Sequence, residues 1–354
     1  MKRLIINADL SFRHIQFLKK TYVKRPKQKY YKSLYSRLYH YQVNHNKFLV
    51  GINKKSIDKM VDYLLEYYDK IILSKPSKLI EIENGFENLV FSEGITSAIQ
   101  LKSINEFLTY IFDYEVFSKT ENKFWNPLEF TKSLNISVCP FCNAQYTFTQ
   151  GVIEKSNNIK FKIRPDLDHF FVQKKHPMLA LSIYNLVPSC SICNSKLKGE
   201  KDGSLDKTIH PYLESIDEIT YFKRIISTKN RDGDPYAQIL GFDNGYKLEL
   251  KEKDVKHRDK VCGFESVYRL GMRYEPYKEI ISRSIKKSML YTDTYIVSLD
   301  NAYGFFNKKK ITKEFYNDDI NNDLLSKVKN DIFKYEIFPL LNSEFKKKEE
   351  EKKN

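Results

Sequence analysis

The segment from residue 139 to residue 199 decides how this sequence is interpreted. It opens with CPFCNAQYTF (139–148), continues through DLDHFFVQKKHP (166–177) and closes with NLVPSCSICNSKLKG (185–199). Two CxxC pairs, Cys139 with Cys142 and Cys190 with Cys193, bracket it. Cysteines paired at this spacing are typical of a closed tetrahedral zinc site with four sulfur ligands. The sequence therefore predicts a structural zinc ion that joins a knuckle at the first pair to a helix beginning near the second.

Polar residues suited to phosphodiester hydrolysis lie within this zinc frame. Asp168 and Asn194 offer oxygen ligands to a hard divalent ion, and a site with so few protein ligands suits Mg²⁺ or Mn²⁺. His169 can act as a general base because an imidazole titrates close to neutral pH. No acid occurs between His169 and Gly199, which predicts a positive face beside the site.

These motifs resemble those of the HNH, or ββα-metal, endonucleases over about residues 134–215. They are most similar to a bacterial subset in which two CxxC pairs frame the HNH core. Members of that subset often accompany an ATPase in anti-phage defence loci such as Septu-type systems. The resemblance implies that His169 is the general base and that Asn185 holds the loop carrying it. It also implies that Lys198 is the basic residue after the CN motif, and Lys174 and Lys175 could contact flanking phosphates.

One position departs from the common HNH pattern. Asn194 stands where many of these enzymes have a histidine, although the HNH domains of RNA-guided nucleases share this asparagine and the Asp-x-Asp-His opening. An amide oxygen binds softer ions such as Zn²⁺ less well than an imidazole does. For Asp166, the first residue of that opening, a local hydrogen-bonding role is favoured over a role in adjusting the metal site.

The pattern of the whole chain predicts an α+β protein in three parts. Residues 1–130 form a mainly helical basic region, 131–215 the zinc-framed HNH domain, and 216–354 a mixed region that ends in a charged tail. Apolar periodicity predicts helices over 57–72, 104–112, 277–289 and 324–332, and Pro127 opens another. The runs QYTFT (145–149) and IKFKI (159–163) predict a hairpin directly before DLDHF, and with the helix after Cys190 they complete a ββα layout. Further strands are expected at 219–226, 237–242 and 246–251.

The positive charge is concentrated near the N-terminus. The chain has 60 Lys and Arg against 45 Asp and Glu, a net charge of +15, and twelve of the cations lie between Asp9 and Asp58 without one acid. This patch, with Lys24, Arg25, Lys27 and Lys29 at its centre, predicts contacts with a nucleic-acid backbone. Tyrosines interleave with the patch, which equally suits an amphipathic helix with a solvated basic face. Codon bias could also inflate the total charge, but not the absence of acids from one segment.

The remaining features bound the location and the function. No apolar run reaches the roughly 18 residues of a membrane span, and the start has no signal-peptide core, so a cytoplasmic protein without membrane contact is expected. Cys262 is left over as an ordinary thiol. The predicted function is a metal-dependent endonuclease acting on nucleic acid, DNA in preference to RNA, with an ATPase as a possible partner subunit. The alternatives are an RNA-cleaving HNH nuclease and a zinc-stabilised, non-catalytic nucleic-acid-binding subunit of a defence complex.

Overall fold

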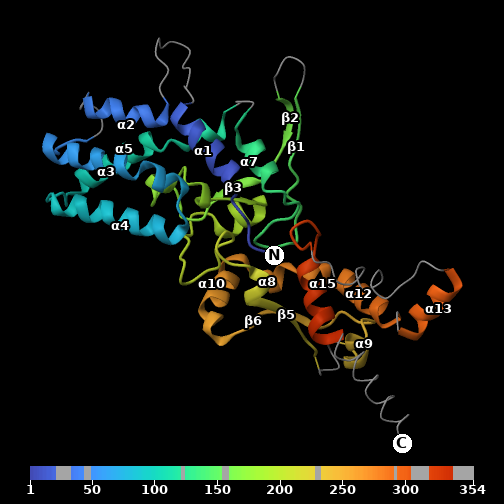
Figure 1. Cartoon of the computed structure of the whole chain (residues 1–354). Helices are drawn as coiled ribbons and strands as arrows, with labels where there is room; N and C mark the ends of the chain where they lie inside the picture. The colour runs from blue at the N-terminus through green and yellow to red at the C-terminus, as the bar shows by residue number, and fades with distance from the viewer. Residues whose placement is uncertain are drawn as a thin grey trace, which may run out of the picture.

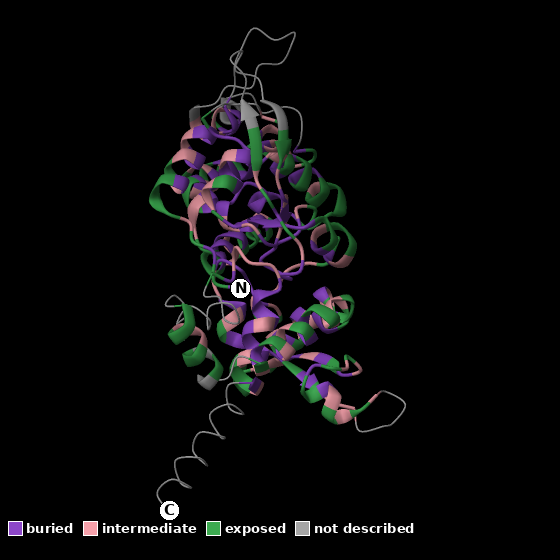
Figure 2. Cartoon of the chain, turned by 90° about the vertical axis from the view of Figure 1, so that its right-hand side faces the viewer, coloured by how far each residue is buried: buried purple, intermediate pink, exposed green. Residues whose placement is uncertain are grey.

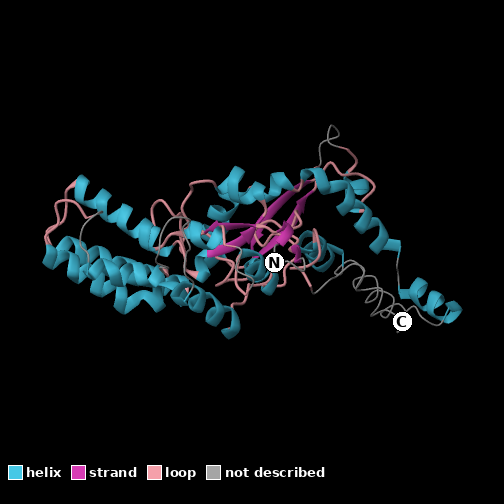
Figure 3. Cartoon of the chain, turned by 90° about the horizontal axis from the view of Figure 1, so that it is seen from above, coloured by secondary structure: helices cyan, strands magenta, loops and turns pink. Residues whose placement is uncertain are grey.

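The computed structural model describes residues 1–20, 33–43, 49–120, 124–153, 159–227, 233–290, 293–303 and 319–337. Within these ranges the protein is a mixture of helices and three small two-stranded sheets. Seen from above, the strands occupy the middle and the helices lie to either side (Figure 3). The expected α+β class is confirmed at this level. The centre of the N-terminal basic patch, including Lys24, Arg25, Lys27 and Lys29, lies outside the described residues, as does the charged tail.

The N-terminal region is helical, as predicted, and its helices gather on one side of the molecule (Figure 1). Asn53 caps the longest of them by accepting a hydrogen bond from the Ser56 amide. Pro76 lies just beyond the end of that helix and opens the next one, because proline is tolerated in a first helical turn. The helices are α1 (Ala8–Lys20), α2 (Leu34–Val43), α3 (Lys54–Leu73), α4 (Pro76–Ser92), α5 (Ala98–Ile111), α6 (Tyr114–Ser118) and α7 (Pro127–Ser133).

The central strands pair differently from the sequence prediction. β1 (Gln150–Ile153) and β2 (Ile159–Ile163) form an antiparallel hairpin, but residues 145–149 precede its first strand. The DLDH segment is β3 (Asp166–His169), and it pairs with β4 (Leu186–Ser189) and not with that hairpin. Pro188 hid β4 in the sequence, yet proline is compatible with a two-stranded sheet, where every strand is an edge. The strand–strand–helix unit is therefore β3, β4 and the wide helical turn η3 (Ile192–Lys198), with the short turns η1 (Pro177–Leu179) and η2 (Ile183–Asn185) between the strands.

The C-terminal region is mixed, as expected, with one wrong assignment. Residues 237–242 were expected to form a strand, but Asp234 caps a helical turn opened by Pro235 there. The strands predicted on either side are confirmed and pair with each other. The elements are α8 (Ile216–Ile219), β5 (Thr220–Ile225), α9 (Pro235–Ile239), β6 (Lys247–Glu252), η5 (Val255–His257), α10 (Arg258–Tyr268), α11 (Leu270–Arg273), η6 (Glu275–Tyr277), α12 (Lys278–Leu290), α13 (Asp293–Tyr303), α15 (Ser326–Ile332) and η7 (Phe333–Ile337).

One hydrophobic cluster runs through all three predicted parts of the chain. It includes Met60 and Leu64 of α3, the cysteine knuckle, and Phe264 and Val328 of the C-terminal region. The buried residues concentrate in the interior of an upper and a lower lobe, and the N-terminus lies between them (Figure 2). Within the described ranges, none of the helices has the length and apolarity that crossing a membrane requires.

Candidate functional site

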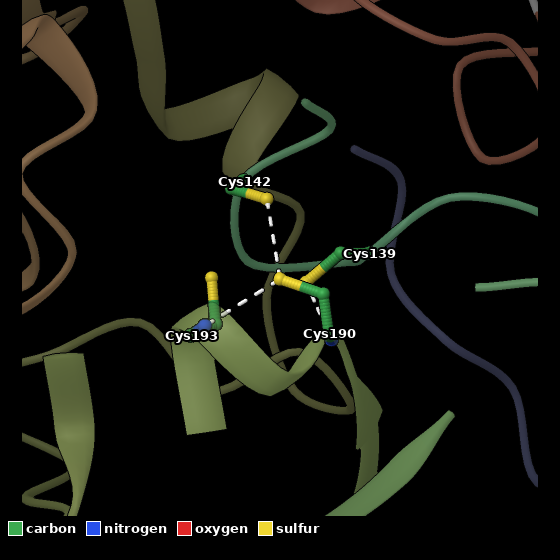
Figure 4. Close-up of side chains that lie close together, drawn as sticks. All are labelled: Cys139, Cys142, Cys190 and Cys193. Atoms are coloured by element: carbon green, nitrogen blue, oxygen red, sulfur yellow. Dashed lines mark hydrogen bonds between the residues drawn. The ribbon is translucent and has the colours of Figure 1, made fainter. Parts of the chain in front are cut away.

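The four cysteines meet at one point, where the knuckle after Ile136 approaches the start of η3 (Figure 4). All four are buried, and their sulfur atoms lie within 4.8 Å of one another. The Sγ atoms of Cys142 and Cys190 are 3.9 Å apart. A tetrahedral zinc ion with bonds of about 2.3 Å separates its sulfur ligands by about 3.8 Å, so the cluster fits such an ion. The residues predicted as the structural site could therefore hold a metal ion such as zinc.

The local backbone explains why each pair converges. After Cys142 the chain turns through Asn143, whose φ of 51° is in the left-handed region that asparagine tolerates better than most residues. The Asn143 amide then donates to the Cys139 carbonyl at 2.8 Å, which closes the knuckle. At the second pair, the amide of Cys193 points at the Cys190 sulfur, 3.4 Å away. Amides directed at sulfur favour the thiolate form that a metal requires.

The C-terminal region supports the cysteine cluster from outside, which the sequence did not suggest. The Arg273 guanidinium donates to the Cys193 sulfur at 3.0 Å, and the Tyr274 hydroxyl donates to the Cys142 carbonyl at 2.6 Å. The Asn143 side chain donates to the Ile320 carbonyl and accepts from the Lys327 amide. The only local signal for these contacts was the asparagine that directly follows CPFC. The cysteine cluster therefore connects the central region to the C-terminal region through hydrogen bonds.

Asp168 lies on β3 with a buried carboxylate. Its Oδ1 accepts from the Lys198 ammonium at 3.0 Å, and its Oδ2 has no partner among the described residues. Burial raises the pKa of Asp168 to about 6, even though the charge of Lys198 opposes this shift. Lys198 also donates to the His169 carbonyl at 2.6 Å. The ammonium of Lys198 therefore points from η3 towards the buried carboxylate and the β3 backbone, and a phosphate contact by this expected basic residue stays a prediction.

Asn194, the second predicted ligand of the catalytic ion, lies on η3 and contacts Asp166 of β3. Its side-chain amide donates to Asp166 Oδ2 at 3.3 Å, and Asp166 is two residues from Asp168 on the same face of the strand. The hydrogen-bond partner of Asp166 is therefore 28 positions away in the chain, on η3, and is not the local partner that the sequence favoured. The two oxygen ligands predicted for a catalytic ion are placed on neighbouring elements, each engaged by another side chain.

The imidazole of His169 is held from two sides. Its Nε2 donates to the Ala180 carbonyl at 3.0 Å, and the ring of Tyr114 from α6 meets it edge to face at 4.5 Å. Burial lowers the pKa of His169 to about 4, so the ring is neutral at pH 7. Since Nε2 carries the proton, Nδ1 has the lone pair, and within the described chain no hydrogen bond engages it. An anionic group nearby would raise this pKa towards the working range of a general base.

Asn185 closes the loop between β3 and β4. Its buried side chain accepts from the Phe171 amide at 2.7 Å and donates to the carbonyls of Phe171 and Leu179 at 3.1 and 3.0 Å. The loop that it ties together ends beside Ala180, the residue whose carbonyl orients His169. The position of Asn185 is thus compatible with the loop-holding role expected for it.

Two other histidines brace the same loop. His14 of α1 is buried, donates to the Leu181 carbonyl at 2.9 Å and accepts from the Trp125 indole at 3.0 Å. The ring of His176 lies between two carboxylates, with Nδ1 2.7 Å from Glu83 of α4 and Nε2 2.8 Å from Asp202. The carboxylates face opposite edges of the ring, so these three side chains form a clamp and do not converge on one ion.

Two lysines of the positive face predicted beside the site lie next to acids. Lys174 pairs with Glu200, and Lys175 lies 3.9 Å from Asp202. Glu200 follows Gly199 directly and Asp202 lies two residues further on, so both acids are just beyond the acid-free stretch of the sequence. Both lysines remain exposed, so their predicted phosphate contacts require exchange of partners.

The N-terminal helices reach the site through α6. Arg37 of α2 is buried and donates to the Tyr110 carbonyl at 2.7 Å and to Asp113 at 3.0 Å. Asp113 caps α6, and the next residue is Tyr114, which packs on His169. Tyr35 of α2 packs against Tyr68 of α3, so this part of the basic segment is a helix packed on the body of the protein.

Comparisons of the chain with protein-family models, with curated proteins and with solved structures found no match.

Proposed function

We propose that this chain is a metal-dependent endonuclease of the HNH type that hydrolyses phosphodiester bonds in nucleic acid, DNA in preference to RNA. The observation that carries the proposal is the β3–β4–η3 unit. It brings a buried carboxylate, an oriented neutral imidazole and a side-chain amide onto adjoining elements within a four-cysteine frame. This combination of groups suits hydrolysis of a phosphate ester by an activated water.

In this proposal His169 is the general base. Its Nδ1 accepts a proton from water, the water oxygen forms a bond to phosphorus, and the bond from phosphorus to the leaving oxygen breaks. The Ala180 carbonyl and the Tyr114 ring hold the imidazole so that Nδ1 keeps one orientation. Asn185 acts indirectly, by fixing the loop that carries Ala180.

Asp168 and Asn194 would hold the catalytic ion. Bound Mg²⁺ or Mn²⁺ would supply positive charge to the nonbridging and leaving oxygens. The unpaired buried oxygen of Asp168 fits this assignment, because a buried carboxylate oxygen without a partner is costly unless a ligand uses it. Lys198 neutralises the other oxygen of that carboxylate in the arrangement described here. The expectations of an ATPase partner and of a role in anti-phage defence belong to this proposal and rest on the sequence resemblance.

The test is cleavage by matched histidine variants. Supercoiled plasmid, single-stranded DNA and RNA are incubated with wild type, His169→Ala and His257→Ala, with and without added Mg²⁺ or Mn²⁺. His257 lies on η5 in the C-terminal region, away from β3, and serves as the control. His169→Ala is expected to lose about 10²-fold or more of the cleavage rate, the usual contribution of a general base, while its zinc content stays unchanged.

Each outcome of that test has a clear meaning. Cleavage by His169→Ala at the wild-type rate would remove His169 as the general base, and cleavage that needs no divalent ion would contradict the metal-dependent mechanism. Absence of cleavage by wild type on every substrate would favour the second candidate, a zinc-stabilised nucleic-acid-binding subunit, for which the Lys198–Asp168 pair is a permanent structural contact. Faster cleavage of RNA than of DNA would keep the mechanism and change the substrate.

A further inference from the structure

Two aromatic side chains stack on each other at the surface between the cysteine knuckle and the β1–β2 hairpin. The rings of Tyr146 and Phe148 are 4.6 Å apart and inclined by only 15°. About half of each side chain is exposed, at 50% and 47%. Large exposed apolar residues in contact with each other often mark a binding surface, whereas single ones are common everywhere. The pair, which we call the 146/148 platform, has no assigned role in the proposed reaction.

The strand register extends this aromatic surface along one side of the hairpin. Gln150 lies directly opposite Ile163 of β2, so Ile163 points to the same side as Tyr146 and Phe148. Ile163 is itself 47% exposed. The hairpin projects from the body of the protein (Figure 1). Three residues after Ile163 the chain enters β3, the strand that carries Asp168 and His169.

The platform is rigid because the knuckle supports its backbone. Tyr146 forms a β-bridge with Val138, and the Thr147 amide donates to the Ser137 carbonyl at 2.8 Å. Next to these contacts, the Gln145 carbonyl accepts a hydrogen bond from the Cys139 amide at 2.9 Å. The platform therefore needs little ordering when a ligand binds, which lowers the entropic cost of binding.

The charge around the platform indicates a polyanionic partner. From Glu129 to Asp166 the sequence contains five cations, Lys132, Lys155, Lys160, Lys162 and Arg164, and a single intervening acid, Glu154. In the described part of this segment, Lys162 is exposed and lies opposite Gly151, so it points to the other side of the hairpin from the aromatic rings. Among the described residues, the aromatic platform and the charge of Lys162 thus lie on different sides of this segment.

We propose that the 146/148 platform stacks an unpaired base of a nucleic-acid strand whose phosphates contact Lys162. Stacking on an aromatic ring requires a base with a free face, so the platform selects single-stranded, frayed or bulged nucleic acid over intact duplex. The proposal rests on the proposed function in that the partner is nucleic acid. It narrows the substrate class to nucleic acid that contains unstacked nucleotides.

The test measures binding without cleavage. Fluorescence anisotropy is recorded without added divalent ion for a labelled single-stranded 15-mer and for the blunt duplex of the same sequence. The proteins are wild type, the double variant Tyr146→Ala/Phe148→Ala and the control Tyr236→Ala, an aromatic residue that is 77% exposed on α9. The double variant should bind the single strand about tenfold or more weakly, since stacking is worth about 1–3 kcal/mol per base. Its duplex affinity, and both affinities of the control, should stay within about twofold of wild type.

A second measurement detects stacking itself. An oligonucleotide with one 2-aminopurine should lose fluorescence on binding to wild type and lose less on binding to Tyr146→Leu/Phe148→Leu, a variant that keeps apolar bulk. Unchanged single-strand affinity in the alanine double variant, or equal losses for single strand and duplex, would overturn the proposal. Loss of a co-purifying protein with unchanged oligonucleotide affinity would also overturn it and assign the platform to a protein partner. Because cleavage is not measured, a failure here is distinct from a failure of the His169 test.

Discussion

The clamp around His176 makes the stability of the protein depend on pH in a defined window. Burial by itself lowers the pKa of His176, but the hydrogen bonds and charges of Glu83 and Asp202 outweigh burial and raise the pKa to about 9. An unfolded histidine titrates near 6.5. Because the folded value lies above the unfolded one, the clamp stabilises the fold fully below pH 6.5. That stabilisation is lost as the pH rises through 9.

The pKa difference sets the size of the effect. Each pH unit between the two values is worth about 1.4 kcal/mol, so the clamp contributes at most about 3 kcal/mol. The carboxylate of Glu83 opposes part of this gain, since burial raises its pKa despite the hydrogen bond from His176. The clamp joins α4 to the loop between β3 and β4, so its loss should loosen the segment that ends at Ala180 and orients His169.

The assay compares urea unfolding of wild type and His176→Gln at pH 6 and pH 9. The variant should be less stable than wild type by about 3 kcal/mol or less at pH 6, and the difference should shrink towards zero above pH 9. His257→Gln is the matched control and should show no such trend. An NMR titration of the His176 ring provides an independent check, with an expected midpoint near 9. A midpoint near 6.5, or a stability difference independent of pH, would refute the argument.

Substitutions at three further positions test the site. Cys190→Ser should release about one equivalent of zinc, measured with a chromogenic chelator, and should lower the melting temperature, because metal binding and folding are coupled. Retained zinc together with an unchanged melting transition would contradict the four-sulfur site. Tyr114→Ala should weaken the orientation of His169 and reduce kcat with little change in KM. Tyr114→Phe keeps the edge-to-face contact and should have a kcat close to that of wild type. Equal losses of kcat in the two variants would instead implicate the Tyr114 hydroxyl. Lys198→Met leaves the Asp168 carboxylate buried without its counter-ion, so urea unfolding at pH 8 should show a loss of about 3–5 kcal/mol, and added Mn²⁺ should restore more stability to the variant than to wild type. Equal gains from Mn²⁺ in both proteins would remove Asp168 as a metal ligand.

The sequence by itself determined the features that depend on local spacing. A CxxC pair brings two sulfurs to one side of a single turn, so the composition of the cysteine cluster followed from two short motifs. The helices with a regular apolar period, such as α3, α5 and α12, were also predictable, because the period specifies both the conformation and the face to be buried. The Asp168–His169 pair could be predicted as a metal ligand beside a general base without knowing which strand pairs with β3.

The tertiary structure alone decided the contacts between residues far apart in the chain. Glu83 and His176 are 93 positions apart, and no local pattern marks the carboxylate that will face a given histidine. The pairing of β3 with β4 depended on burial of Leu186 and Val187, which outweighed the proline that follows them. Lys198 points inward because the surrounding core buries the Asp168 carboxylate, and a buried carboxylate requires a counter-ion. Local patterns specify which groups are present, whereas burial decides which of them meet, because desolvation makes a long-range partner necessary.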